Sequence, residues 1–512
     1  MKIAMTGMSG NMGTEVFRQT MELESVELVR LLLSNKKKNN KLVKKLQKSY
    51  GGRVEILRGS VDDRELCKKL VEGMDYVLHM AAVIPPASDT SPEASYKCNH
   101  LGAMAMVDAV KAAYPQPKYI HISTVALYGN RNEKHLFGRV GDPLLVSPYD
   151  YYAMHKLFGE RYCLDSDLDC WVVLRQTAML HNNMLKDNIS DGLMFHTAMN
   201  APLEWASARD SGYLLKRIFE RDSKGEIPHF WKKIYNIGAG EGGRETGYDT
   251  FIDGFRMIGG STEKFFKPNW FAARNFHGVW FADSNELEEL FQYQRDTATS
   301  FWDEIASHHK IYKLGKIVPA KLIHLFLFRR LLKHHNSPRQ WVLGKETEKV
   351  TATFGSQEAA DNLSSDWKDY KLVSKGDFGD YDELRKVKNA VLLDHGYDES
   401  KPQDSWDVDD MRSAAKFRGG EVVSENVEGA YSKITWRCHD GHEFDASPYT
   451  VLRGGHWCPK CCQPTPWDFD RLAKTSPFFA QVWYDSHETD EDNCYSLGDN
   501  YRPVLTKLGE EK

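Results

Sequence analysis

The stretch Lys2-Ile3-Ala4-Met5-Thr6-Gly7-Met8-Ser9-Gly10-Asn11-Met12-Gly13 decides the fold of this 512-residue chain. Its apolar start predicts a buried strand, and residues 15–21 predict a helix directly after the turn. Glycine permits a tight turn at Gly7, close approach of a phosphate at Gly10, and close helix–strand packing at Gly13. The N–H groups and dipole at such a helix start bind phosphates. The stretch therefore predicts a site for the pyrophosphate of a dinucleotide.

Strands and helices continue to alternate after this turn. Strands that alternate with helices predict an α/β fold built on a doubly wound parallel sheet with right-handed crossovers. Ligands of such sheets bind beyond the carboxyl ends of the strands. The predicted strands lie at residues 26–33, 54–57, 75–82, 119–124 and 171–174, and residues 99–102 open a further predicted helix.

The end of the second strand bears on the choice of cofactor. An NAD site usually places a carboxylate there for the ribose 2′-hydroxyl. Here the strand runs into Ser34-Asn35-Lys36-Lys37-Lys38, which offers three ammonium groups and no carboxylate. This chemistry suits a 2′-phosphate, so NADP(H) is preferred over NAD(H). The alternative is that residues 36–48 form a solvated basic helix face.

A second motif, Tyr152-Ala-Met-His-Lys156, indicates acid–base chemistry. A phenol with an ordinary pKa of about 10 is a poor base at neutral pH. Lys156 lies one helical turn beyond Tyr152, on the same face, and favours the phenolate electrostatically. The pair can therefore move a proton while a dinucleotide moves a hydride. An isolated match of this kind is compatible with an ordinary surface helix.

Residues 1–310 resemble an extended short-chain dehydrogenase/reductase, of the NAD(P)-dependent epimerase/dehydratase-like kind and with features of the hydroxysteroid dehydrogenases. The resemblance implies a Rossmann-type sheet with a small substrate lobe, and a late strand at residues 235–238 that returns to the sheet. It also implies a catalytic group of Thr124, Tyr152 and Lys156, supported by Asn99. The motifs that carry it are the TGxxGxxG turn, HMAA at 79–82, NHLG at 99–102, STVALYG at 123–129 and YAMHK at 152–156.

The cofactor contacts that the resemblance implies are spread over four strand ends and the catalytic helix. One departure is Ser60, because the family usually has Asp beside the adenine, which weakens the adenine contact. The expected contacts are Thr6, Gly7, Ser9, Gly10, Asn11, Met12, Gly13, Ser34, Asn35, Lys36, Ser60, Val61, Met80, Ala81, Ala82, Tyr152 and Lys156.

The region after Arg175 bears on the substrate. Nucleotide-sugar enzymes of this family usually carry Asn soon after this Arg, whereas Gln176 and Thr177 stand here and Asn182 comes late. We therefore predict an NADP(H)-dependent oxidoreductase for a secondary alcohol or ketone, such as a hydroxysteroid. The alternatives are a nucleotide-sugar epimerase or dehydratase, and a non-catalytic dinucleotide-sensing protein. The apolar residues that could line a substrate pocket, or instead form the core of the small lobe, are Met194, Phe195, Trp205 and residues 265–271.

The last hundred residues carry a separate metal signal. Cys438, His442, Cys458 and Cys461 form a C-x3-H and C-x2-C set. Three thiolates and one imidazole complete a tetrahedral shell for structural Zn²⁺. Residues 405–512 are therefore predicted to form a small domain that resembles zinc-ribbon or treble-clef modules. Cys462 in place of Cys461, or His439 in place of His442, are the alternative ligands.

Residues 311–404 are predicted to be a helical connector. Within them, residues 317–335 are apolar with a basic end. Such a helix can lie in a membrane interface and make a peripheral contact. The favoured alternative is a helix docked on the enzyme domain.

Composition is that of an ordinary globular enzyme, with 41% hydrophobic residues and a net charge of −5. This charge gives no general attraction to nucleic acid. The scattered cysteines and the C-x2-C pair favour a reducing compartment, and neither a signal peptide nor a membrane-spanning run is evident. We therefore expect a cytoplasmic protein that binds a small-molecule substrate, and a homo-oligomer with a dimer as the favoured form.

Overall fold

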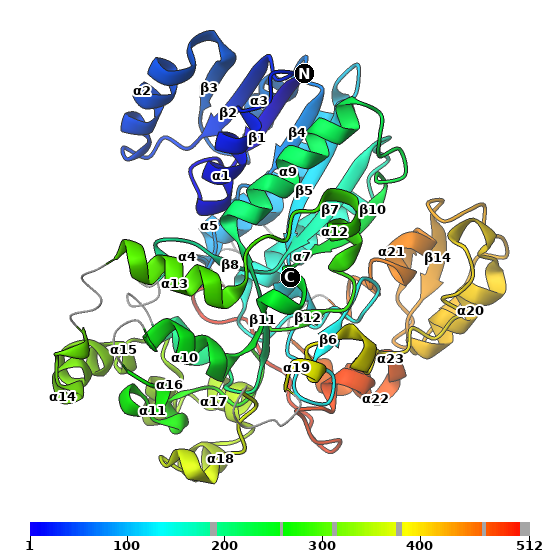
Figure 1. The fold of residues 1–512 in the computed structure, drawn as a ribbon. Helices are drawn as coiled ribbons and strands as arrows, with labels where there is room; N and C mark the ends of the chain where they lie inside the picture. Colours follow the sequence, from blue (N-terminus) through cyan, green and yellow to red (C-terminus); the bar gives the residue numbers. More distant parts are fainter. Residues whose placement is uncertain (185–191, 257–259, 310–314, 375–380, 463–466, 502–512) are drawn as a thin grey trace.

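The computed structural model describes residues 1–184, 192–256, 260–309, 315–374, 381–462 and 467–501. Its centre is a seven-stranded sheet in the order β10-β7-β5-β4-β1-β2-β3 (Figure 1). Every neighbouring pair is parallel. The Rossmann-type prediction is confirmed, including the late strand. The strands are β1 (Lys2–Thr6), β2 (Leu28–Leu33), β3 (Val54–Arg58), β4 (Tyr76–His79), β5 (Lys118–Thr124), β7 (Trp171–Gln176) and β10 (Lys233–Ile237).

Helices cover both faces of the sheet because strand side chains alternate between the two faces. One core contains Ile3 and Met5 of β1 together with apolar residues of α1 (Asn11–Thr20) and α9 (Ala208–Ser223). The opposite core contains Ala4. The helices on this second face are α3 (Arg64–Val71), α6 (Gly102–Ala112) and α7 (Tyr151–Leu164). Residues 99–101, predicted to open a helix, lie instead in a π-helical segment, Tyr96–Leu101, that leads into α6.

A small lobe follows the sheet. It contains a three-stranded sheet in the order β11-β9-β8 and an aromatic core. Phe195, Phe265 and Phe266 are almost fully buried in this core, so they belong to the lobe interior rather than to a pocket wall. The elements are β8 (Ala178–Leu180), β9 (Pro202–Ser207), β11 (Arg244–Thr246), α10 (Gly247–Arg256), α11 (Thr262–Phe265) and α13 (Ala298–His308).

The following segment is mainly helical over residues 320–361 and mostly irregular beyond them, where it is described. Phe328 and Leu331 pack into the aromatic core of the small lobe. No helix among the described residues is both long and apolar enough to cross a membrane. The helices are α14 (Ala320–Ile323), α15 (Arg329–Leu332), α16 (Pro338–Gly344), α17 (Thr347–Phe354), α18 (Gln357–Asp361) and α19 (Tyr381–Leu384), with a π-helical segment, His324–Phe328, between α14 and α15.

The C-terminal part packs on the α7 face of the main sheet, beside β10 (Figure 1). The Tyr449 hydroxyl accepts a hydrogen bond from the backbone N–H of Ile234 in β10. Its apolar residues share one core with α6 and α7, so this part is tightly joined to the sheet. Its elements are α20 (Val408–Phe417), β13 (Glu421–Val422), β14 (Ile434–Arg437), β15 (Glu443–Ala446), α21 (Pro448–Leu452), α22 (Phe469–Thr475) and α23 (Pro477–Trp483).

Candidate functional site

The glycine turn has the shape that a pyrophosphate requires. Gly7 has a left-handed φ of +76°, and a Cβ there would lie 2.6 Å from the carbonyl carbon of Met80. A Cβ at Gly13 would lie 2.3 Å from the carbonyl oxygen of Gly7, whereas one at Gly10 would meet nothing closer than 3.4 Å. Packing therefore demands glycine at two positions, and the third leaves an open approach to the start of α1. No side chain caps that helix start, so its N–H groups can bind phosphate.

Thr6 has a structural role. Its hydroxyl oxygen accepts hydrogen bonds from the backbone N–H groups of Met80 and Ala81, at 3.2 and 3.1 Å. Burial lowers the pKa of His79 to about 3, so its neutral Nδ1 can accept the Thr6 hydroxyl at 3.0 Å. Thr6 thus fixes the loop after β4, along which the expected contacts Met80, Ala81 and Ala82 lie.

The end of β2 is open and basic. Ser34, Asn35 and Lys36 are exposed there. The Asn39 side-chain amide donates to the Ser34 carbonyl and hydroxyl oxygens, at 2.9 and 3.0 Å, and so holds the turn. At the end of β3, the Ser60 hydroxyl donates to the Asp62 carboxylate. Neighbouring Val61 is buried, and its side chain packs toward Gly102.

The predicted catalytic residues meet at the carboxyl end of β5. Thr124 ends that strand, and Tyr152 lies in the first turn of α7. Burial raises the pKa of Tyr152 to about 12; a hydrogen bond with Thr124 opposes this rise, and the Asp150 carboxylate adds to it. In the protein alone the phenol is therefore protonated.

Lys156 is held against the main sheet. The Lys156 ammonium group donates to the backbone carbonyl of Ile122 in β5. Burial lowers the pKa of Lys156 to about 8, since its side chain has almost no contact with water. Its charge is held beside the strand end that carries Thr124.

Asn99 supports the site through structure. Its amide donates to the Val83 carbonyl and the Ser95 hydroxyl, at 2.9 and 3.0 Å, and its oxygen accepts from the Val83 N–H at 2.8 Å. These bonds fasten the loop that follows β4 to the helix beneath it. The π-helical segment displays Asn99 toward this loop.

Tyr152 faces an inner pocket of about 310 Å³ in the small lobe. Of the residues that could line a pocket or form the lobe core, Met194 and Trp205 line this pocket, whereas Phe195 and the aromatic residues of 265–271 do not. Among the described residues of its wall there is no Lys or Arg. The apolar wall is formed by Ile84, Pro85, Val125, Ala178, Met179, Met184, Leu193, Met194, Leu203, Trp205, Phe251, Phe255, Phe276, Val279 and Trp302.

His277 was not predicted, and it lies in the wall of the inner pocket. Its Nδ1 is 3.0 Å from one carboxylate oxygen of Asp150. The other oxygen of Asp150 accepts the N–H of Ala153 and caps α7. The helix cap therefore orients a second acid–base group beside Tyr152. A single His far along the chain carries no motif, so only the fold reveals this role.

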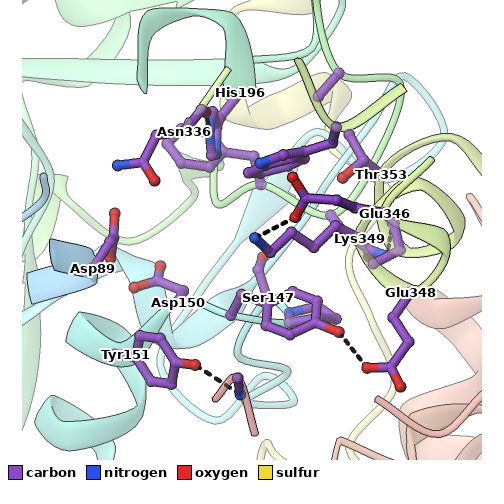
Figure 2. A pocket seen from close by; sticks show the side chains of 18 of the residues that line it. Asp89, Ser147, Asp150, Tyr151, His196, Asn336, Glu346, Glu348, Lys349 and Thr353 are labelled. Atoms are coloured by element: carbon purple, nitrogen blue, oxygen red, sulfur yellow. Dashed lines mark hydrogen bonds and ion pairs between the residues drawn. The ribbon is translucent and has the colours of Figure 1, made fainter. Parts of the chain in front are cut away.

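An outer pocket of about 630 Å³ adjoins the inner one, and the two share Pro85, Leu193 and Phe276. Figure 2 shows this outer pocket with Asp150, Glu346 and Glu348 among its side chains. Its wall mixes apolar surface with the carboxylates of Asp89, Asp150, Glu346, Glu348 and Asp499. Glu346 pairs with Lys349 at 2.7 Å, and Glu348 accepts the Tyr149 hydroxyl at 2.8 Å. Residues 496–500 close one side, so the C-terminal segment contributes to the approach to the candidate active site.

The predicted metal ligands come together. The donor atoms of Cys438, His442, Cys458 and Cys461 all lie within 4.8 Å of one another. The Sγ atoms of Cys438 and Cys461 are 3.5 Å apart, and Nδ1 of His442 is 3.2 Å from the second of these sulfurs. Ligands at ordinary zinc bond lengths of about 2.0–2.3 Å in a tetrahedron are separated by similar distances. Neither alternative ligand, His439 or Cys462, belongs to this cluster.

One family model matches the first third of the chain. Residues 3–176 match the model of the NAD dependent epimerase/dehydratase family. The matched segment contains the glycine turn, Thr124 and both residues of the Tyr–Lys pair.

Solved structures with a similar chain course cover about three fifths of this chain. One is a dTDP-glucose 4,6-dehydratase from Bacillus anthracis in complex with NAD, at 15% identity over 61% of this chain and 97% of that chain, with a TM-score of 0.47. Another is a UDP-glucuronic acid 4-epimerase from Bacillus cereus with NAD, at 20% identity over 62% and 99%, with a TM-score of 0.44. A third is a short-chain dehydrogenase/reductase superfamily protein from Agrobacterium tumefaciens with bound NAD, at 16% identity over 62% and 99%, with a TM-score of 0.44. Likeness at this level implies no substrate.

Proposed function

We propose that the protein is an NADP(H)-dependent oxidoreductase that interconverts a ketone and a secondary alcohol on an apolar substrate. The observation that carries this proposal is the inner pocket, where Tyr152 shares a wall with aliphatic and aromatic side chains. A nucleotide sugar would bring two negative phosphates to a wall whose described residues include no Lys or Arg. The cations of the adjoining outer pocket, Arg274 and Lys349, are already paired with Glu491 and Glu346. Desolvating such charges without a partner is costly, so an apolar ketone, such as a ketosteroid, fits better.

The residues of the site divide the work of ketone reduction. A nicotinamide dinucleotide would be held by the glycine turn and would supply the hydride when bound. Tyr152, protonated at neutral pH, donates its proton to the carbonyl oxygen as negative charge develops there. Thr124 hydrogen-bonds Tyr152 and orients the same oxygen. Lys156 places a positive charge at the end of β5, which favours the phenolate that Tyr152 becomes.

A substrate panel monitored by nicotinamide absorbance tests the proposal. Apolar ketones and secondary alcohols, including hydroxysteroids, are offered with each cofactor, NADP(H) and NAD(H). We expect net cofactor oxidation or reduction with at least one apolar substrate. Turnover confined to nucleotide sugars would contradict the proposal.

The preference for a phosphorylated cofactor is a separate part of the proposal. The exposed Lys36 at the end of β2 is the cation best placed for a 2′-phosphate, because no carboxylate stands at that strand end. Lys36→Glu should weaken NADPH binding at least ten-fold and leave NADH binding within about two-fold, because only NADPH carries the extra charge. Equal losses for both cofactors would argue against the preference.

A second candidate is the epimerase or dehydratase chemistry after which the matched family is named. The His277–Asp150 pair favours it, since these reactions need more than one acid–base group and His277 lies in the same pocket as Tyr152. The distinguishing result is product formation without net change in nicotinamide absorbance. A protein that only senses the dinucleotide would bind it and form no product with any substrate.

We also propose that Cys438, His442, Cys458 and Cys461 hold a structural Zn²⁺. Four protein ligands complete the tetrahedron and leave no open position for substrate. The Cys461 thiol lies 3.1 Å from an Asp440 carboxylate oxygen, and Arg471 pairs with the same carboxylate at 2.7 Å. Asp440 and Arg471 therefore lie directly outside the ligand set.

A further inference from the structure

Residues 315–345, here called the basic segment, have an unusual charge balance. The protein has a net charge of −5, yet this segment contains Lys and Arg residues and no Asp or Glu. None of its cations forms an ion pair with any described residue. All are exposed except Arg339, which is half-buried. They are Lys316, Lys321, Arg329, Arg330, Lys333, Arg339 and Lys345.

The same segment also exposes large apolar side chains. Ile317 is 78% exposed and Phe326 is 75% exposed, whereas Phe328 is completely buried in the aromatic core of the small lobe. One face of the segment is therefore docked on the lobe, as expected, and another projects outward at the corner that α14 occupies in Figure 1. The remaining exposed apolar residues of the segment are Val318, Leu322, Leu325 and Leu343.

Cations and apolar side chains line a common groove of about 550 Å³. No carboxylate is among the described residues of its wall. The apolar part is formed by Ala320, Leu325, Leu332 and Leu343, with His324 between them, and the cations are Lys264, Lys321, Arg329, Lys333 and Arg339. A surface that offers cations for phosphates and protruding apolar side chains for acyl chains suits the interface of a bilayer.

We propose that the basic segment docks the protein on a bilayer rich in anionic phospholipid. Other binding partners would match either the cations or the exposed apolar side chains of the segment, but not both. A polyanion such as a nucleic acid satisfies the cations and leaves Ile317 and Phe326 in water. A second copy on a two-fold axis would place like charges opposite one another, because the segment has no carboxylate to pair with them. An anionic bilayer satisfies both features.

The docked face lies close to the candidate substrate pocket. Phe255 lines the inner pocket, and its ring centre is 6.1 Å from that of Phe328 in the basic segment. This aromatic contact joins the lobe-docked face of the basic segment, opposite the proposed membrane face, to the pocket wall. Docking would bring the pocket near a bilayer in which an apolar substrate dissolves. The docking itself rests on the surface alone and is tested without substrate or cofactor.

Co-sedimentation of the full chain with vesicles tests the docking. Phosphatidylcholine vesicles with and without phosphatidylserine are compared at low and at physiological salt. We expect at least ten-fold stronger partitioning onto the phosphatidylserine vesicles, and weaker binding as salt rises, because the cations act through screened electrostatics. The double variants Ile317→Ser/Phe326→Ser and Lys321→Glu/Arg330→Glu should each lower partitioning at least ten-fold.

Two control variants separate this surface from general charge and apolar exposure. Lys41→Glu/Lys44→Glu removes exposed cations from α2 (Asn39–Tyr50), a basic helix elsewhere on the protein. Val391→Ser removes a side chain that is 61% exposed outside the segment. Neither control should change partitioning, and circular dichroism should show that all variants fold.

Three results would overturn the docking. The first is no binding to phosphatidylserine vesicles at low salt. The second is an equal loss of vesicle partitioning in the segment variants and in the control variants. The third is a change of oligomeric state, or of heparin binding, in the Ile317→Ser/Phe326→Ser variant without any vesicle binding, which would assign the face to a second copy or to a polyanion.

Discussion

Glu160 provides the sharpest test of how the C-terminal part supports the candidate active site. It lies two turns after Tyr152 on α7 and is completely buried. Its carboxylate is 2.6 Å from the Arg175 guanidinium and 3.0 Å from Nε2 of His456. Burial alone would raise the pKa of Glu160, but Arg175 and His456 hold it well below its usual range. Arg175 also donates to the Gly454 carbonyl at 2.6 Å.

Glu160→Gln removes the charge that compensates a fully buried Arg175. Breaking one side of a buried ion pair costs about 3–5 kcal/mol of unfolding free energy. Because Arg175 keeps neutral hydrogen bonds to the Tyr128 hydroxyl and the Gly454 carbonyl, we expect about 3 kcal/mol. Since α7 carries Tyr152 and Lys156, NADPH binding should weaken as well.

The assay is denaturant unfolding followed by circular dichroism, together with a NADPH titration. Glu65→Gln is the matched control, because Glu65 pairs with Lys68 at 2.7 Å and is 74% exposed. Such a surface pair contributes at most about 1 kcal/mol. If Glu160→Gln unfolds at the same denaturant concentration as Glu65→Gln, the network does not hold α7 to the C-terminal part, and the reasoning is refuted.

Three further predictions concern the cofactor turn, the buried lysine and the metal. Gly10→Ala should leave folding intact, since a Cβ there meets nothing closer than 3.4 Å, and should weaken NADPH binding at least ten-fold. The control Gly52→Ala, at a position with open space, should change neither folding nor NADPH affinity. Equal NADPH affinity in the two variants would contradict the role of the turn. Burial lowers the pKa of Lys156 to about 8, so the unfolded chain holds this proton more tightly and stability should rise as pH increases above about 8. Lys156→Met should abolish turnover and reduce the rise of the denaturant midpoint with pH. The same dependence of the midpoint on pH in the variant and the wild type would contradict the burial argument. Metal analysis should find one zinc per chain in the wild type and in Cys462→Ser, and none in Cys461→Ser; the reverse pattern would reassign the ligand.

The main sheet was predictable because its signals are local. The glycine turn needs only neighbouring strand and helix, and Gly7 and Gly13 occupy positions where a Cβ would clash. The Cys–His cluster could also be predicted from the sequence, because the spacing of its residues restricts how they can bind a metal. Some strand ends differ by a few residues from their predicted positions. The strand β4 ends at His79, whereas the prediction extended it to residue 82.

The remaining features depend on contacts between distant segments. Aromatic residues in a sequence give no sign of which rings face a cavity, and Phe195, a candidate for the pocket wall or the lobe core, is buried in the core. His277 acquires its role only through Asp150, and Glu160 only through His456. The raised pKa of Tyr152 follows from burial, which a motif does not reveal.

The central claim is that Tyr152 transfers the proton in a nicotinamide-dependent reaction, and Tyr152→Phe tests it most directly. The measurement is the rate of nicotinamide absorbance change with the best substrate of the panel, beside NADPH affinity and thermal unfolding. We predict that turnover falls by at least about a hundred-fold, while affinity and unfolding stay within the range of the wild type. Turnover close to that of the wild type in a folded, NADPH-binding variant would contradict the account.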